Sequence, residues 1–333
     1  MPYNLGMSDY TPDLQGRAIL MVSDYVDENY DEEDLKEEKE FLKEIKRDLK
    51  KFGIKFHFLE FKTLAELKRR LKKFNRDEVV VFNWADEIYG LPNTGHVITS
   101  FFEENGYRYS GASTQNLLLS MDRRQVSKVL KKKGVSVPKQ HNLKKEKIDF
   151  PIIVKARYEH GSFGMSRKSV VSNKKELREL LKEINYEHFI GEKYIDGPEY
   201  TISVWGNNEP EILTICDIRF ESNAGEKFKI IDYKSKWDKS DGGYHGIYSA
   251  KAESIEKDIQ KKLTNLIKKA YRALECKGFT RFEVRVEGGK PYLIDFNPNP
   301  NFRPGTAFIK SANDMGYNLG QIVAKLCQFA LDG

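Results

Sequence analysis

Two adjacent features near the middle of the chain could together bind a phosphorylated ligand. The strand-like run 151–154 leads into Lys155, and a loop with Gly161, Ser162 and Gly164 follows it. Glycines let a backbone approach an anion closely, and successive N–H groups can surround it. A lysine at the end of a strand beside such a loop is suited to phosphate. A plain turn with a surface lysine would have the same sequence.

A hairpin near the C-terminus carries side chains that could hold a metal ion. Its expected strands are 280–286 and 291–296, and the turn contains either two residues, 288–289, or three, 288–290. Carboxylate and amide oxygens are the ligands that Mg²⁺ prefers, and a neighbouring arginine could stabilise an anionic transition state. The polar residues of this hairpin are Arg281, Glu283, Asp295 and Asn297.

The length of that turn decides whether these side chains meet. A two-residue turn pairs Glu283 with Ile294 and places Glu283 on the opposite face from Asp295. A three-residue loop pairs Glu283 with Asp295 and Arg281 with Asn297, so that all four polar groups share one face. The residues alone leave a metal site and an exposed charged strand face as alternatives.

A third segment could bind a nucleoside. Residues 192–199 join a strand to a turn, so their backbone could pair with a planar base, and Glu199 could accept ribose hydroxyls. The alternative is a surface turn with acidic residues.

The elements around these segments indicate an α/β N-terminal region followed by α+β structure. Strands and helices alternate up to residue 111, which predicts a parallel sheet with crossover helices. Asn83 follows a buried strand, where it either caps a turn or lines a ligand site. The expected strands are 18–22, 54–61, 79–83, 152–155, 188–193, 201–205, 211–220, 280–286 and 291–296, and the expected helices are 27–51, 64–74, 123–133, 174–184, 256–275 and 318–330.

Composition restricts the class of protein. The chain has 333 residues with 56 basic and 50 acidic side chains, giving a net charge of +6 in short, separate clusters. A nucleic-acid-binding protein concentrates its excess charge in a stripe, so that alternative is disfavoured. The three cysteines are scattered, and we find neither a secretory signal nor a membrane span. These features predict a cytoplasmic protein with no nucleic-acid or membrane partner.

Taken together, the three segments resemble the ATP-grasp ligases and are most similar to their D-alanine–D-alanine ligase branch. The resemblance covers roughly residues 79–330. It lies in the stretches 120–123 (Ser-Met-Asp-Arg), 151–165, 192–199, 233–237 (Tyr-Lys-Ser-Lys-Trp), 278–283 and 293–297. It implies the three-residue hairpin loop, and an ATP-grasp fold behind an N-terminal Rossmann-like domain. The domains would be 1–121, 122–192 with the phosphate-binding flap, and 193–333 with the metals.

The resemblance also implies roles for individual residues. ATP would contact Arg123, Lys155, Ser162, Glu192, Lys193, Ile195 and Glu199. Two Mg²⁺ ions, or Mn²⁺ in their place, would bind Glu283, Asp295 and Asn297. Lys236, Arg281 and Asn301 would act in catalysis, and Asn83, Arg303 and Thr306 would contact substrate. The reaction implied joins a small-molecule carboxylate to an amine, with ADP and phosphate as products, through an acyl phosphate. A homodimer is left open.

Several departures from the branch bear on the substrates. Arg123 replaces its lysine, Glu283 its aspartate and Asp295 its glutamate. Residues 299–302 replace its Pro-Gly stretch, and its N-terminal Gly-Gly-x-Ser-x-Glu signature is absent. We therefore expect amino acid or peptide substrates other than two D-alanines. The alternatives are a D-alanine–D-alanine ligase proper and a regulatory module that binds ATP without catalysis.

Overall fold

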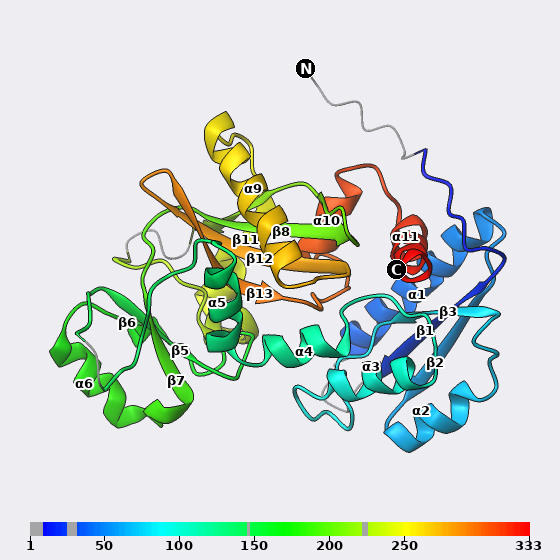
Figure 1. Cartoon of the computed structure of the whole chain (residues 1–333), viewed down its shortest axis with the longest axis horizontal. Coiled ribbons are helices and arrows are strands. Elements are labelled where there is room, and N and C mark those ends of the chain that lie inside the picture. The colour runs from blue at the N-terminus through cyan, green and yellow to red at the C-terminus, as the bar shows by residue number, and fades with distance from the viewer. Residues whose placement is uncertain (1–8, 25–31, 145–146, 222–225) are drawn as a thin grey trace.

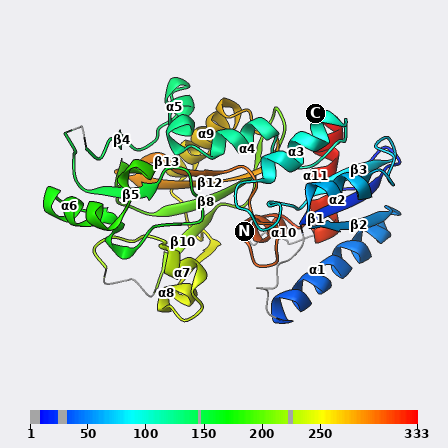
Figure 2. The ribbon, with the colours of Figure 1, turned by 90° about the horizontal axis from the view of Figure 1, so that it is seen from below.

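Three β-sheets, arranged along the long axis of the molecule, organise the chain (Figure 1). The computed structural model describes residues 9–24, 32–144, 147–221 and 226–333. The turned view places the N-terminal sheet at one end and the small central sheet at the other, with the largest sheet between them (Figure 2).

The N-terminal sheet is parallel, with strand order β2-β1-β3. Its strands are β1 (Ala18–Asp24), β2 (Phe56–Phe61) and β3 (Val79–Asn83), and its helices are α1 (Glu32–Lys51), α2 (Leu64–Leu71) and α3 (Gly95–Glu104). All five side chains of β3 are buried, as expected for a parallel strand covered on both faces. Thr63 caps α2 by accepting a hydrogen bond from the N–H of Glu66.

The central sheet is antiparallel and has the order β4-β7-β5-β6. Its strands are β4 (Gln140–His141), β5 (Ile152–Ala156), β6 (Val170–Val171) and β7 (Phe189–Lys193), and α6 (Lys174–Glu183) packs beside them. Ile152, Val154, Leu177 and Leu180 form a small apolar core between this sheet and α6. The side chain of Ile153 points to the other face of β5, where it packs with Val170, Tyr194 and Ile230. Lys155 shares that face and lines a cavity.

The largest sheet has the main order β11-β10-β8-β12-β13, and β9 pairs with β8. Its strands are β8 (Glu199–Gly206), β9 (Glu211–Ile212), β10 (Cys216–Phe220), β11 (Ile247–Lys251), β12 (Gly278–Glu287) and β13 (Lys290–Asn297). Two helices, α5 (Arg123–Lys132) and α9 (Lys257–Ala273), cover one face with an apolar core that includes Leu263, Ile267 and Phe282. The part of the opposite face that lines the cavity is polar, whereas Trp205 and Phe279 on the same face pack into a core shared with β1 and β3.

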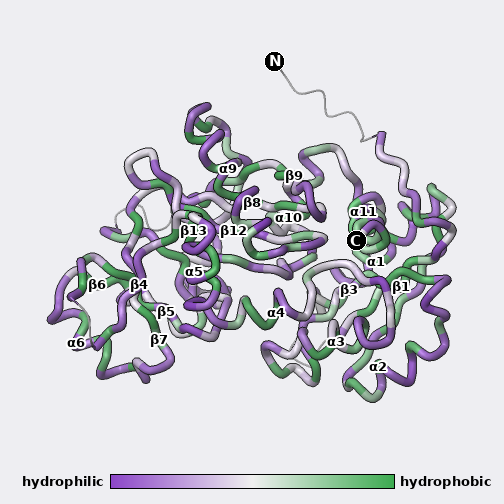
Figure 3. The backbone as a smooth tube through the Cα atoms, viewed as in Figure 1, coloured by the Kyte–Doolittle hydropathy of each residue, from purple (hydrophilic) through white to green (hydrophobic). Residues whose placement is uncertain are grey.

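The last helix of the chain packs against the N-terminal region. Four further helices are α4 (Thr114–Ser120), α7 (Tyr233–Trp237), α8 (Gly242–Gly246) and α10 (Ala307–Asn313), and the chain closes with α11 (Leu319–Asp332). The largely hydrophobic α11 (Figure 3) packs against α1 and β3. Ile322 and Val323 share one buried core with Ile19 and Ile45 of the N-terminal region.

The element predictions succeed best where hydrophobic patterning is strong. The expected parallel N-terminal sheet is confirmed, and β3 has the predicted bounds. The single strand expected over 211–220 is wrong, because β9 and β10 are separate strands. The intervening Leu213 turns its side chain into the core while its N–H donates to the carbonyl of Ser203. The short helices α3, α4, α7, α8 and α10 were not predicted as elements.

Removing the side chain of Ile322 should destabilise the N-terminal region although that residue lies near the C-terminus. Ile322 has no exposed surface, so Ile322→Ala leaves a cavity in the shared core and should lower the free energy of unfolding by about 2–5 kcal/mol. Urea unfolding measures this. Leu118→Ala, at a side chain that is half exposed, is the control and should change stability little. Equal stability of the two variants would contradict a shared core.

Candidate active site

One cavity of about 1230 Å³ collects the residues singled out from the sequence. Its walls come from all three sheets and from the segments that join them. The lining includes Asn83, Arg123, Lys155, Ser162, Glu192, Lys193, Ile195, Glu199, Lys236, Arg281, Glu283, Asp295, Asn297, Asn301, Arg303 and Thr306. Residues separated by more than two hundred positions in the chain therefore face a common space.

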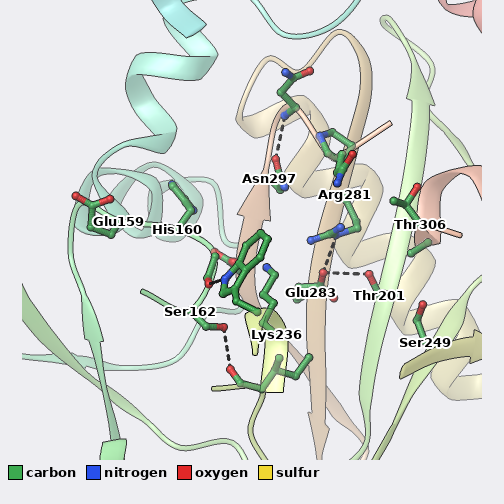
Figure 4. Close-up of a pocket in the computed structure, with 18 of the residues that line it drawn as sticks. Glu159, His160, Ser162, Thr201, Lys236, Ser249, Arg281, Glu283, Asn297 and Thr306 are labelled. Carbon is green, nitrogen blue, oxygen red and sulfur yellow. Dashed lines mark hydrogen bonds and ion pairs between the residues drawn. The ribbon is translucent and has the colours of Figure 1, made fainter. Parts of the chain in front are cut away.

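The polar wall of the cavity is set by the pairing of β8, β12 and β13. Glu283 lies opposite Thr201 on one side and Asp295 on the other, and Arg281 lies opposite Asn297. Because alternate residues of a strand share a face, Arg281 and Glu283 both point into the cavity, where the Arg281 Nε donates to Glu283 Oε1 at 2.8 Å. The hydroxyl of Thr201 donates to the same oxygen at 3.0 Å (Figure 4).

The predicted pairing of the hairpin is confirmed, but the predicted three-residue loop is wrong. Glu287 pairs with Lys290, which leaves the two residues 288–289 in the turn. An irregularity between Glu283 and Val284 then shifts the register by one residue. This β-bulge restores the alignment of Glu283 with Asp295 that the two-residue turn alone would prevent.

Each carboxylate of the predicted metal site has an arginine beside it. Arg123 Nη1 lies 2.5 Å from Asp295 Oδ1, and the other nitrogens of its guanidinium donate to the carbonyls of Ala156 and Glu159. Burial acts to raise the pKa of Asp295, but Arg123 and His160 outweigh it and hold that pKa below its usual range. Burial raises the pKa of Glu283 to about 7 against the opposing charge of Arg281.

The donor set suits a divalent cation such as Mg²⁺. Glu283, Asp295 and Asn297 offer two carboxylates and an amide oxygen from neighbouring positions of one hairpin. Glu283 Oε2 is buried and accepts no hydrogen bond within the described part of the chain. A buried, unsatisfied carboxylate oxygen is costly, and a bound cation would remove that cost.

The end of the cavity that is predicted to bind the nucleotide contains an ion pair and a backbone N–H without an acceptor in the described residues. Lys155 Nζ lies 3.0 Å from Glu192 Oε2, and Gln140 donates to the other oxygen of Glu192 at 2.9 Å. The N–H of Lys193 is used by the carbonyl of Lys139, whereas that of Ile195 donates to no acceptor in the residues described. Ile195 lines the same cavity as Lys155.

The glycine-rich loop is docked onto α7 across the cavity. Ser162, with a φ of 64°, donates its hydroxyl to the carbonyl of Ile231 at 2.8 Å (Figure 4). Trp237 donates to the carbonyl of Gly161 at 2.9 Å. Lys236 lines the cavity beside this loop and remains accessible to solvent, but partial desolvation and the charge of Arg281 both lower its pKa. The side chain of Lys236 therefore lies near Glu283, and its protonated form is less stable there than in water.

At the opposite end, the proposed substrate residues already have protein partners. Asn83 is buried and its side-chain oxygen accepts from the N–H of Ala85, so it serves the turn after β3 as well as lining the cavity. The Thr306 hydroxyl donates to the carbonyl of Arg303 at 2.8 Å. Arg303 Nη2 lies 3.9 Å from Glu38 Oε2.

Four carboxylates line this end, and of these only Asp24, at the end of the first strand, was a candidate for a substrate pocket from the sequence. They are Asp24, Glu38, Asp86 and Glu87. The N–H groups of Asp86 and Glu87 both donate to Asp24. Their positions after β1 and β3 were a usable signal, because ligands bind at the carboxyl ends of parallel strands. Glu38 carried no such signal, since it lies within α1 among other acidic residues.

The family follows from comparison with known proteins. A family model described as the C-terminus of D-Ala–D-Ala ligase matches residues 124–328. The chain belongs to the D-alanine–D-alanine ligase family. It is accordingly an ATP-grasp carbon–nitrogen ligase, of the class that joins carboxylates to amines at the expense of ATP and acts on small molecules.

Relatives and solved structures agree with this membership. Proteins named D-alanine–D-alanine ligase from Desulforudis audaxviator and Moorella thermoacetica are 26% and 27% identical to the chain, over 73% and 80% of it and 79% and 86% of theirs. The structure of the Bacillus anthracis ligase complexed with ATP superposes with a TM-score of 0.69 at 20% identity, covering 95% of this chain and 98% of the other. The VanG D-Ala:D-Ser ligase from Enterococcus faecalis gives 0.67 at 19% identity, covering 94% and 99%. These likenesses establish the ATP-grasp fold.

In the described ranges, no helix of this ligase is both long and apolar enough to cross a membrane.

Glu283→Gln should stabilise the ligase at pH 8 in metal-free buffer. The native pKa of Glu283, about 7, exceeds its ordinary value of 4.5, so the native state binds more protons than the unfolded state between these values. Stability conferred by the wild-type side chain therefore falls as pH rises through that window. Glutamine does not titrate, and we expect a gain of about 1–3 kcal/mol at pH 8 that vanishes near pH 4.5.

Urea unfolding in EDTA at several pH values measures this difference. Glu226→Gln, at a carboxylate whose ion pair lies at the surface, is the control and should show no comparable gain. A less stable Glu283→Gln variant at pH 8 would contradict the unsatisfied state of this carboxylate.

Proposed function

We propose that this ligase uses Mg-ATP to join the carboxylate of one amino acid or peptide to the amine of another through an acyl phosphate. We further propose that its substrates are not two D-alanines. The observation that carries the proposal is the single cavity in which Lys155, Lys236 and Arg281 face the paired carboxylates Glu283 and Asp295. Phosphoryl transfer needs this positioning and charge neutralisation, and it needs no nucleophilic side chain.

The residues divide the work along the cavity. Arg123, Lys155 and Ser162 would bind phosphates, with Glu192, Lys193, Ile195 and Glu199 around the nucleoside. Glu283, Asp295 and Asn297 would hold two Mg²⁺ ions, which neutralise phosphate charge when bound. The three units of this arrangement would be residues 1–121, 122–192 and 193–333.

Two bond exchanges account for the products. A substrate carboxylate oxygen attacks the γ-phosphorus of the co-substrate ATP, and the bond to ADP breaks. The amine of the second substrate then attacks the acyl carbon, loses a proton and expels phosphate. Lys236 and Arg281 lie where they could bind the transferred group and the oxyanion, and an N–H of Asn301 could add a donor.

The acidic end of the cavity supports substrates that carry ammonium groups. Asp24, Glu38, Asp86 and Glu87 gather there against a single described arginine, Arg303. Arg303 and Thr306 are placed to meet a substrate carboxylate, and Asn83 lines the same end. Amino acids and short peptides combine both charges.

A second candidate function has its own support. The names of the relatives from Desulforudis audaxviator and Moorella thermoacetica favour a D-alanine–D-alanine ligase proper. The absence of the Gly-Gly-x-Ser-x-Glu signature and the replacement of Pro-Gly by residues 299–302 favour other substrates.

Phosphate release from Mg-ATP should require a pair of substrates. We expect release with at least one pairing in a matrix of L- and D-amino acids and dipeptides, and little with single compounds. Efficient release with D-alanine alone would instead identify a D-alanine–D-alanine ligase. Bound ATP with no release across the matrix would favour the non-catalytic module and contradict our proposal.

Asp295→Ala should reduce the rate of phosphate release by at least about 100-fold, because it removes a carboxylate that neutralises charge at the transferred group. Asp258→Ala, at an exposed carboxylate of α9, is the matched control and should keep the wild-type rate. A full rate in the Asp295→Ala variant would overturn the metal assignment while leaving the ligase activity in place.

A further inference from the structure

A buried arginine lies at the nucleoside end of the polar wall and has no part in the roles described so far. Arg285 follows Arg281 and Glu283 on the same face of β12 and is 5% exposed. Its register partner in β8 is Glu199, at the first position of that strand. The polar wall therefore continues by one more charged pair, whose side chains are 6% and 8% exposed.

The guanidinium of Arg285 joins three separate segments. Its Nε and Nη2 lie 2.8 and 2.7 Å from the same oxygen, Oε2 of Glu199. Nη1 donates to the carbonyl of Ile195 at 3.2 Å, and Nη2 also donates to the carbonyl of Lys229. The plane of the group lies over the ring of Tyr194, 5.0 Å from its centroid.

The backbone of the turn beside the Arg285–Glu199 pair is also held in place by β12. The N–H of Val286 donates to the carbonyl of Pro198, and a Cβ at Gly197 would lie 1.9 Å from the carbonyl oxygen of Val286. Only glycine fits there, which brings the turn 194–198 against β12 beside Arg285. The carbonyl and the free N–H of Ile195 thus have set positions.

The geometry leaves one oxygen of Glu199 for a ligand. Both arginine nitrogens converge on Oε2, and in the described residues no group donates a hydrogen bond to Oε1. Glu199 lines the cavity, so Oε1 lies at its wall. A planar guanidinium restricts the rotation of a carboxylate far more than a lysine ammonium does, because its donors are held in one fork.

We propose that Arg285 is a positioning residue for the sugar of the nucleotide. It holds Glu199 so that Oε1 accepts a ribose hydroxyl, and it fixes the Ile195 backbone beside the base through the same guanidinium. The inference rests on the proposed binding of ATP in this cavity. It deepens that proposal by predicting a preference for ribonucleotides over 2′-deoxyribonucleotides that depends on Arg285.

Calorimetric titration of the full chain with ATP and with 2′-deoxyATP, each with Mg²⁺ and without amino acids, tests this. A hydrogen bond to a charged acceptor is worth enough for the wild type to bind ATP about tenfold or more tightly than 2′-deoxyATP. In Arg285→Lys that ratio should fall to about two or less, because ATP loses more affinity than 2′-deoxyATP. A structural role alone would weaken both nucleotides equally.

Two further variants sharpen the result. Arg285→Gln keeps a donor near Glu199 without burying an ammonium group, and it should lower the ratio as Arg285→Lys does. Arg272→Lys makes the same substitution at a half-exposed helix position and should keep the wild-type ratio. Circular dichroism and melting temperature show whether each variant is folded.

The outcomes separate this inference from the proposed function. A wild type that binds neither nucleotide contradicts the proposed function. A wild type that binds both equally overturns the sugar assignment, whether or not the variants fold. A preference for ATP that persists in folded Arg285→Lys and Arg285→Gln overturns the role of Arg285 alone.

Discussion

The antiparallel pairing of β8, β12 and β13 is the constraint on which the site depends. Side chains alternate between the faces of a strand, so a slip of one residue would exchange the polar wall for the apolar core. The pairing aligns Glu283 with both Thr201 and Asp295, and two positions further along it aligns Arg285 with Glu199. A single bulge between Glu283 and Val284 maintains this alignment. The apolar faces of the same strands pack on α5 and α9, which fixes the choice of face.

Buried charged side chains on these strands are paired with side chains of opposite charge, because burying an isolated charge costs a large amount of free energy. Arg285 and Glu199 compensate each other, as do Arg123 and Asp295. Arg123 and Asp295 are also two of the positions at which the chain departs from the lysine and glutamate of the D-alanine ligase branch. In the described part of the chain, Glu283 Oε2 is buried and accepts no hydrogen bond, which is the state expected of a carboxylate that binds a cation.

Sequence reasoning succeeded where the signal is local or is carried by a motif. Buried runs such as Val79–Asn83 identified the parallel sheet, and the motifs identified the residues that meet in one cavity. It failed on the length of the hairpin loop, because a β-bulge adds one residue to one strand of a pair and has no recognisable pattern in the sequence. It also failed to find Arg285 and Glu38, whose roles arise from partners on other elements. Short helices such as α7 escaped notice because five residues hold too few apolar positions to show a period.

The position of α11 has a consequence for how the protein is made. The first sheet buries Ile19 and Ile45 against Ile322 and Val323, which lie about three hundred residues later in the chain. During translation, the N-terminal region leaves the ribosome long before the helix that completes its core. Domains usually fold in order of synthesis, but this one cannot complete its core until α11 has been synthesised. The apolar surface that α11 covers stays exposed until then.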